Sequence, residues 1–202
     1  MTTEAVEHPA RRYDPHRRDR IIDACLDVIA EVGVAGVSHR RVAEAADVPL
    51  GSMTYHFSGM SELLHEAFNR FANAFSDRFA VRLAAAADRD AAVAAITEAV
   101  EGDILSDQRE LVLTQELYTL AARDASYRDI TNAWMGRSRA ALERHFDPAT
   151  ARMLDALIEG LTLHRALDTE SQGGHVVTTA IARLVTTDSD TDTDTDTAGE
   201  TP

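Results

Sequence analysis

The 202-residue chain has a single cysteine, Cys25, so it cannot form a disulfide within itself. No apolar run approaches the roughly 20 residues that a membrane-spanning helix needs. The first 18 residues lack the apolar core of a secretory signal. These absences predict a soluble, cytoplasmic protein from a reducing compartment, in which Cys25 is a small buried apolar group rather than a redox sensor.

Signals for β-strands are also missing. Aromatic residues make up only 5% of the chain, and no segment shows the alternation of apolar and polar residues between turns that marks a strand. Alanine-rich stretches such as residues 81–96 favour helix instead, because alanine loses no side-chain entropy there. The predicted fold class is all-α, with about nine helices.

Charge is unevenly distributed along the chain. Lysine is absent, since all 20 basic residues are arginine, and the net charge is −14. Between Ala10 and Met60, however, seven arginines balance seven acidic residues, so the rest of the chain carries the whole excess. The overall charge argues against nucleic acid as a partner, but the neutral N-terminal segment remains compatible with it.

The N-terminal quarter is organised as one long helix and two short ones. A helix from near Pro15 to Val32 has apolar residues on one face, and Gly33 is suited to end it in a left-handed cap. Ser38 can cap a second helix over residues 39–46. Asp47 tolerates the left-handed turn that follows, and Pro49 opens a third helix over residues 50–56.

This arrangement is that of a helix-turn-helix, and residues 18–64 resemble the TetR family of repressors. The resemblance lies in the strings SHRRVAEAADV, MTYHF and SELL. It implies a helix-turn-helix DNA-binding domain at residues 16–58 and a larger helical ligand-binding and dimerisation domain at residues 59–187. Outside these, composition predicts a flexible arm over residues 1–15 and a disordered acidic Asp-Thr tail over residues 188–202.

In a helix-turn-helix the last helix, here residues 50–56, lies in the major groove of DNA. This helix and the start of the helix before it supply the candidate DNA contacts, which are Ser38, Arg40, Arg41, Gly51, Ser52, Met53, Thr54, Tyr55 and His56. The sequence departs from the family at Met60, where relatives usually carry a lysine that meets a phosphate. The N-terminus of the following helix, Arg40 or Arg41 would then have to make that contact.

The resemblance also implies a homodimer and a small-molecule pocket in the C-terminal domain. The candidate pocket residues are Phe68, Phe71, Phe75, Gln115, Tyr118, Trp134, Met135 and His164, although an aromatic stripe at helical spacing is more often plain core. The candidate dimer interface, on helices 149–167 and 173–186, consists of Leu154, Leu157, Ile158, Leu161, Val177, Ile181 and Leu184. No metal site or cofactor is predicted, because the eight histidines are scattered.

These features predict a DNA-binding transcriptional regulator: a repressor released from a near-palindromic operator on double-stranded DNA by an unknown small-molecule effector. Two alternatives belong to other classes. An enzyme lacks support, since no nucleophile–base pair or phosphate-binding loop is present. The other alternative is an adaptor that binds another protein and whose helix-turn-helix no longer reads DNA. Only Met60 and the net negative charge of the chain favour it.

Overall fold

A computed structural model describes residues 14–170 and 175–189, and this part of the chain contains helices and no strand. The sequence-predicted arm falls almost entirely outside the described residues, as does nearly all of the Asp-Thr tail. The helices, in chain order, are α1 (Arg17–Val32), the 3-10 turn η1 (Val34–Gly36), α2 (His39–Ala45), α3 (Gly51–His56), α4 (Met60–Ala84), α5 (Arg89–Glu98), the π-helical turn η2 (Ala99–Asp103), α6 (Gln108–Ala121), α7 (Ala125–Leu142), α8 (Pro148–Leu167) and α9 (His175–Ser189).

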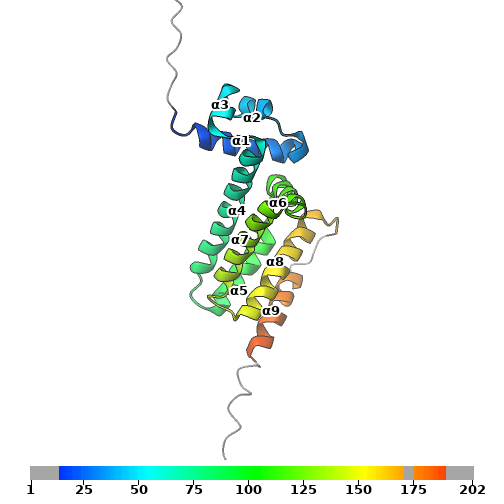
Figure 1. Ribbon diagram of the computed structural model, residues 1–202. Coiled ribbons are helices and arrows are strands. Elements are labelled where there is room, and N and C mark those ends of the chain that lie inside the picture. Colours follow the sequence, from blue (N-terminus) through cyan, green and yellow to red (C-terminus); the bar gives the residue numbers. More distant parts are fainter. Residues whose placement is uncertain (1–13, 171–174, 190–202) are drawn as a thin grey trace, which may run out of the picture.

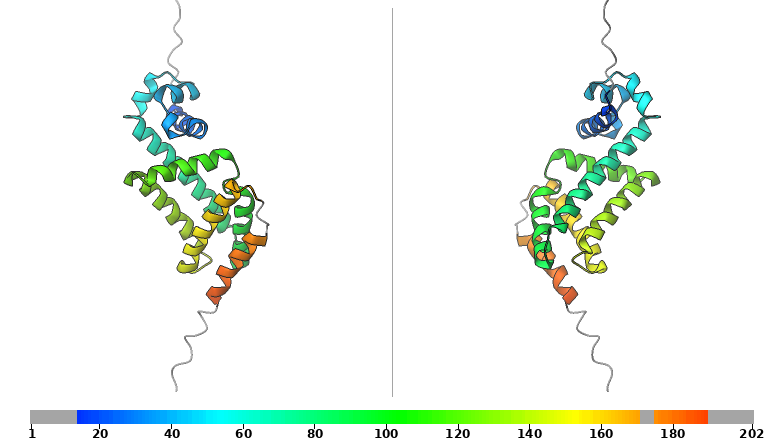
Figure 2. Two further views of the ribbon diagram at one scale, coloured as in Figure 1. Left: turned by 90° about the vertical axis from the view of Figure 1, so that its right-hand side faces the viewer. Right: turned by 90° about the vertical axis from the view of Figure 1, so that its left-hand side faces the viewer.

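We call the segment from α1 to α3 the head and the segment from α4 to α9 the body. Figure 1 shows the head at one end of the molecule, joined to the body by the long helix α4. The turned views of Figure 2 show α6 running across the body directly beneath the head. The predicted all-α fold, with an N-terminal helix-turn-helix and a larger helical region after it, is confirmed.

Local sequence signals explain how the head is built. The Ser38 side chain accepts a hydrogen bond from the Arg41 backbone N–H at 3.3 Å, which caps α2 as expected. Asp47 has a φ of +50° in the turn between α2 and α3. Gly33 ends α1 with a φ of +69° but a ψ of 168°, outside the left-handed helical region that we had expected. The positive φ favours glycine, and a Cβ atom here would also lie 2.6 Å from Oε1 of Glu116 on α6, so the end of that side chain would have to shift.

One aromatic stripe runs the length of α4 and fills two cores. Leu64, Phe68, Phe71, Phe75 and Phe79 are all buried, as their spacing predicts. The upper core joins the stripe to α1, α2, α3, α6 and the first half of α7. The lower core joins the end of α4 to α5, α8, α9 and the second half of α7. The head therefore shares its core with the body.

Residues 90–105 do not form a single α-helix. The α-helix ends at Glu98, a π-helical turn follows, and Leu105 has a φ of +51°. Positive φ is uncommon for a non-glycine residue and costs free energy that the surrounding packing must offset. Arg165 of α8 supports this segment by donating hydrogen bonds to the backbone carbonyls of Glu101 and Ile104.

Among the described helices, none combines the length and the apolar character required to cross a bilayer.

Cys25 provides a test of the upper core. Its side chain is fully buried, and burial raises the pKa of its thiol to about 12. Because the thiolate is the reactive form, we expect native protein at about pH 8 to resist alkylation by iodoacetamide, whereas unfolded protein reacts fully. Labelling can be followed by intact-protein mass spectrometry. Rapid stoichiometric labelling of the native protein would contradict the packing described here.

Candidate functional site

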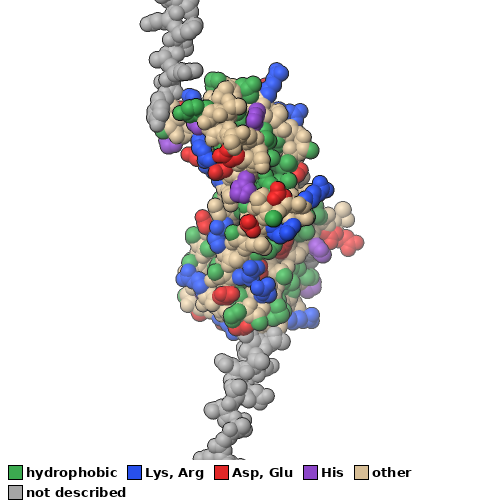
Figure 3. All heavy atoms as spheres, viewed as in Figure 1, with side chains coloured by type: hydrophobic (Ala, Val, Ile, Leu, Met, Phe, Trp, Pro, Cys, Tyr) green, Lys and Arg blue, Asp and Glu red, His purple; other side chains and the backbone are tan. Residues whose placement is uncertain are grey.

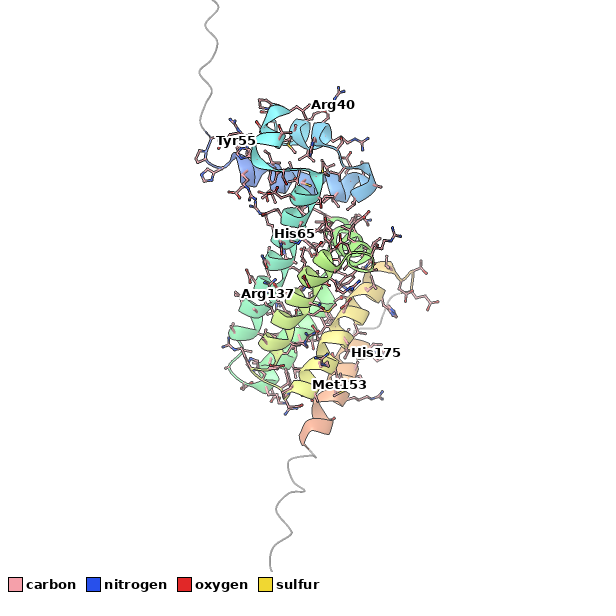
Figure 4. All side chains as sticks on the ribbon, in the orientation of Figure 1. Arg40, Tyr55, His65, Arg137, Met153 and His175 are labelled. Atoms are coloured by element: carbon pink, nitrogen blue, oxygen red, sulfur yellow. The ribbon has the colours of Figure 1, made fainter. Side chains whose placement is uncertain are left out.

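The outer surface of α2 and α3 forms the free end of the molecule. Figure 4 shows Arg40 and Tyr55 on the head, at the opposite end from Met153 and His175 on α8 and α9. Tyr55 is 83% exposed, and its ring meets the edge of the His56 ring with centroids 4.9 Å apart. An aromatic side chain this exposed gains nothing from burial within the chain, so it is available to a partner.

The structure separates the nine predicted DNA contacts into two groups. Ser38, Arg40, Arg41, Gly51, Thr54 and Tyr55 are exposed, and His56 is half-buried. Ser52 and Met53 are instead buried, which corrects their assignment as contacts. The reason is the helical period: α3 has only six residues, and its inner side, continued four residues later by buried Phe57, includes Met53.

The two arginines of α2 are held differently. Nη1 of Arg41 donates to the carbonyl oxygen of Gly36 at 2.8 Å, so this side chain ties α2 to η1. Arg40 is exposed and pairs with no residue in the described part of the chain. Arg40 is therefore the cation of the head best placed to meet a phosphate or a base edge.

Met60 begins α4, is half-buried and packs against the upper core. The N-terminus of α4 is preceded by Ser58, whose backbone N–H and hydroxyl both donate to Oε2 of Glu62, at 2.7 and 2.6 Å. These bonds hold the pKa of Glu62 below its usual range, so the carboxylate stays charged. An apolar side chain and a fixed negative charge make this helix end a poor anion site.

The body contains an aromatic chamber between α4, α6, α7 and α8. Four aromatic side chains, Phe75, Phe79, Tyr118 and Trp134, form much of its wall. The Trp134 ring lies 4.7 Å from Phe75, centroid to centroid, and 6.2 Å from Tyr118, with which it is nearly parallel. The remaining lining residues are Ile104, Leu105, Thr114, Met135, Ser138, Asp155, Ile158, Glu159 and Thr162.

Two carboxylates give the chamber a negative side. Burial raises the pKa of Asp155, while Arg139, with Nη1 at 3.3 Å from Oδ2 of Asp155, opposes that rise. Burial and the neighbouring charge of Glu159 raise the pKa of Tyr118, which keeps its hydroxyl protonated. Oγ1 of Thr114 is buried and has no hydrogen-bond partner among the described residues. The chamber thus offers ring faces, negative charge and a spare hydroxyl.

Half of the predicted pocket residues line this chamber: Phe75, Tyr118, Trp134 and Met135. The others do not, since Phe68 and Phe71 lie in the upper core, Gln115 lies outside the lining, and His164 is exposed. Thr114 and the α8 series Asp155, Ile158, Glu159 and Thr162 line the chamber but were not among the predicted pocket residues. Their spacing of three, four and seven residues is the helical signal that marks one face of α8.

The predicted dimer residues also divide. Leu154, Ile158, Val177 and Ile181 lie in the core of the chain itself, so they offer no surface to a partner, which corrects that choice. Leu157, Leu161 and Leu184 are half-buried. The apolar residues exposed on the two helices are instead Met153, Leu167 and Val176. Both α8 and α9 carry apolar residues on the side that faces the chain's own core and on the side that faces outward. The spacing of large aliphatic residues identified the core-facing side.

Arginines of the body hold the acidic side of α1. Arg70 of α4 pairs with Asp19 and Asp23, the latter at 2.9 Å. Arg109 of α6 pairs with Asp27 at 2.8 Å, and Arg18 pairs with Glu66 at 2.9 Å. The face seen in Figure 3 carries basic and acidic side chains interspersed, without a continuous basic patch.

Comparison with known proteins agrees with this architecture. The family model described as bacterial regulatory proteins, tetR family, matches residues 21–67, and a tetracyclin repressor-like C-terminal domain model matches residues 87–187. The HTH-type transcriptional regulator PksA of Bacillus subtilis (strain 168) is 29% identical over 174 residues, which cover 75% of this chain and 80% of PksA.

Solved structures are similar over most of the chain. The Streptomyces coelicolor A3(2) regulator SCO7518 is 59% identical, with a TM-score of 0.80, over 85% of this chain and 99% of that chain. The multidrug-binding protein EbrR, crystallised with ethidium, is 34% identical, with a TM-score of 0.70, over 84% of this chain and 98% of that chain.

The division of α3 into an inner and an outer side can be tested by stability. Met53→Ala removes a buried side chain and is expected to lower the free energy of unfolding by about 2–5 kcal/mol. Tyr55→Ala, on the exposed side, should change it by less than about 0.5 kcal/mol. Urea denaturation followed by circular dichroism measures both. Equal losses for the two variants would mean that Tyr55 is a structural residue.

Proposed function

Because this chain belongs to the TetR family of bacterial regulatory proteins, whose members are DNA-binding transcriptional regulators, we propose that it is a ligand-released repressor. In this proposal residues 16–58 read a near-palindromic operator, and residues 59–187 bind an effector and form a homodimer. The observation that carries the proposal is the pairing of an exposed reading surface on α2 and α3 with an aromatic chamber in the body.

DNA reading would be carried by the exposed residues of the head. With α3 in the major groove, Thr54 and Tyr55 face the bases, and Gly51 lets the backbone approach closely. Arg40 contacts the phosphate backbone, while Ser38 and Arg41 fix the start of α2. With so few cations available, one head makes few phosphate contacts, so affinity would depend on two heads binding together.

The homodimer would form through the outward sides of α8 and α9. Met153, Leu167 and Val176 are exposed there, and nothing lies within 4 Å of a Cβ built at Gly160, so a second copy could approach closely. Leu157, Leu161 and Leu184 would extend this surface. A two-fold axis at these helices would set two α3 helices about 34–36 Å apart, one turn of DNA.

The effector would be an aromatic cation. EbrR was crystallised with ethidium, proflavin and malachite green, and these structures are 31–34% identical to this chain. Here, the rings of Phe75, Tyr118 and Trp134 can stack on such a ligand, and Asp155 and Glu159 can balance its charge. The unpartnered hydroxyl of Thr114 could accept a hydrogen bond from it.

Helix α6 would carry the signal from the chamber to the head. Thr114 and Tyr118 line the chamber, while Arg109 on the same helix pairs with Asp27 of α1, and Glu116 lies against Gly33. A ligand that displaces α6 must therefore also displace α1 or break these contacts. The two subunits' heads would then no longer match the operator spacing.

The decisive experiment measures operator binding and its release by a ligand. We expect the purified protein to bind a palindromic fragment from its own promoter region far more tightly than a scrambled fragment, as measured by fluorescence anisotropy. Arg40→Ala combined with Tyr55→Ala should weaken this binding at least about tenfold, since it removes one phosphate and one base contact per head. Val81→Ala, an exposed substitution on the body, is the control.

Malachite green should release the wild-type protein from the same fragment. Because such dyes also bind DNA directly, Trp134→Ala on the same fragment measures the direct effect of the dye. Equal binding to palindromic and scrambled DNA would favour the adaptor alternative. Equal release of the wild type and the Trp134 variant would place the ligand outside the chamber.

The coupling through α6 makes a separate prediction. Arg109→Ala should leave operator affinity and dye affinity within about twofold of the wild type, but reduce the release by dye from about tenfold or more to less than about threefold. Operator dissociation constants with and without dye give this ratio. Asp27→Ala should reproduce the loss and Arg123→Ala, an exposed arginine just beyond α6, should not. Unchanged release in both Arg109→Ala and Asp27→Ala would exclude this route.

A further inference from the structure

A second hollow adjoins the chamber on the side of α4 and the start of α6. It shares Phe75, Phe79 and Ile104 with the chamber, so these three side chains form the boundary between the two spaces. Its remaining lining is largely polar and includes Arg78, Arg82 and Glu110. We call it the outer compartment. The two spaces are therefore neighbours, divided by the three shared side chains.

Glu110 is the unusual residue of the outer compartment. It is only 8% exposed, and its Oε1 atom bonds to Nη2 of Arg78. Its Oε2 atom is buried and has no hydrogen-bond partner in the described part of the chain. A carboxylate oxygen withdrawn from water without a donor is costly, so buried polar atoms are normally paired. Oε2 of Glu110 is therefore a ready acceptor for a donor brought by a ligand.

The guanidinium of Arg78 contacts the same two kinds of group that would bind a cationic ligand, an aromatic ring and a carboxylate. Its guanidinium carbon lies 5.3 Å from the centroid of the Phe75 ring, and its Nη2 atom bonds to Glu110. A carboxylate and an aromatic face are the two partners that bind organic cations in proteins. Yet the Arg78 side chain is 60% exposed, so it can swing into water at little cost.

We propose that the outer compartment is a second cation subsite, in which the guanidinium of Arg78 occupies the place of a ligand group. The effector then carries two features: an aromatic cation for the chamber, and a second cationic donor, a primary ammonium or an amidinium, that displaces Arg78 and bonds both oxygens of Glu110. This assignment rests on the proposed function, since it extends the ligand that the chamber would bind.

The neighbouring arginine provides a matched control. Arg82 lies one turn further along α4 and lines the same compartment, but it pairs with the exposed Glu98 at 3.5 Å rather than with Glu110. If the compartment acts only through general charge, the two arginines are equivalent. If Arg78 blocks a specific subsite, only its removal opens that subsite.

A matched pair of ligands tests the subsite: ethidium, and its analogue in which the N-ethyl group is lengthened to an aminopropyl chain. Quenching of Trp134 fluorescence measures both affinities. We expect the analogue to bind the wild type about tenfold more tightly than ethidium, because it adds charged hydrogen bonds to Glu110. Glu110→Gln should abolish this advantage while leaving ethidium affinity unchanged. Arg78→Ala should increase the advantage, and Arg82→Ala should not alter it.

An advantage that survives Glu110→Gln, or that falls in Arg78→Ala, overturns the subsite. If the wild type binds neither dye, the chamber ligand of the proposed function is wrong, and chemical rescue still tests the subsite. Benzamidine supplies an amidinium in place of the missing guanidinium. It should raise the unfolding temperature of Arg78→Ala, but not that of the wild type, Arg82→Ala or Arg78→Ala combined with Glu110→Gln. No rescue of Arg78→Ala overturns the proposal.

Discussion

The aromatic stripe of α4 is the constraint on which the rest of this structure depends. Phe68 and Phe71 complete the core under the head, whereas Phe75 and Phe79 form walls of the chamber and of the outer compartment. A helix of 25 residues, about 38 Å long, carries all four. The walls of the chamber are thus made of side chains that also stabilise the fold. The head has no core of its own, so it cannot move independently of α4.

Part of the acidic charge of the head is paired by arginines of the body. Three acidic residues of α1 face the body, where Arg70 holds Asp19 and Asp23, and Arg109 holds Asp27. Arg40 and Arg41 lie at the other end, on α2. Pairing with the body thus offsets three acidic charges of α1, whereas Arg40 and Arg41 lie beside the exposed Glu44 and Asp47. These pairs are partly exposed, so their value lies more in setting the angle of α1 than in stability.

Much of the fold was predictable because local signals agreed with tertiary packing. Ser38 as a cap, Asp47 at positive φ and the buried stripe of α4 all follow from residue type and helical period. The break after Glu98 was not predictable, because alanine-rich sequence favours an unbroken helix there, and the Arg165 bonds that support the π-helical turn come from a distant helix. For the sites, periodicity identifies apolar faces but not which face meets the chain's own core, which is why Met53, Leu154 and Ile181 were assigned outward.

Helix α6 lines both the chamber and the outer compartment and also contacts the head. Arg109 and Glu110 are adjacent, so their side chains leave the helix about 100° apart: Arg109 toward Asp27 of the head, Glu110 toward Arg78 and the outer compartment. Thr114, one turn later on the same side as Glu110, lines the chamber, and its buried hydroxyl has no partner among the described residues. A ligand that bonds both Thr114 and Glu110 would contact α6 at two points one turn apart, which restricts the rotation of this helix. A ligand confined to the chamber would contact α6 at only one of these points. Because Arg109 lies on the same helix, an effector with two cationic groups would constrain the contact between α6 and α1 more than one that only fills the aromatic space.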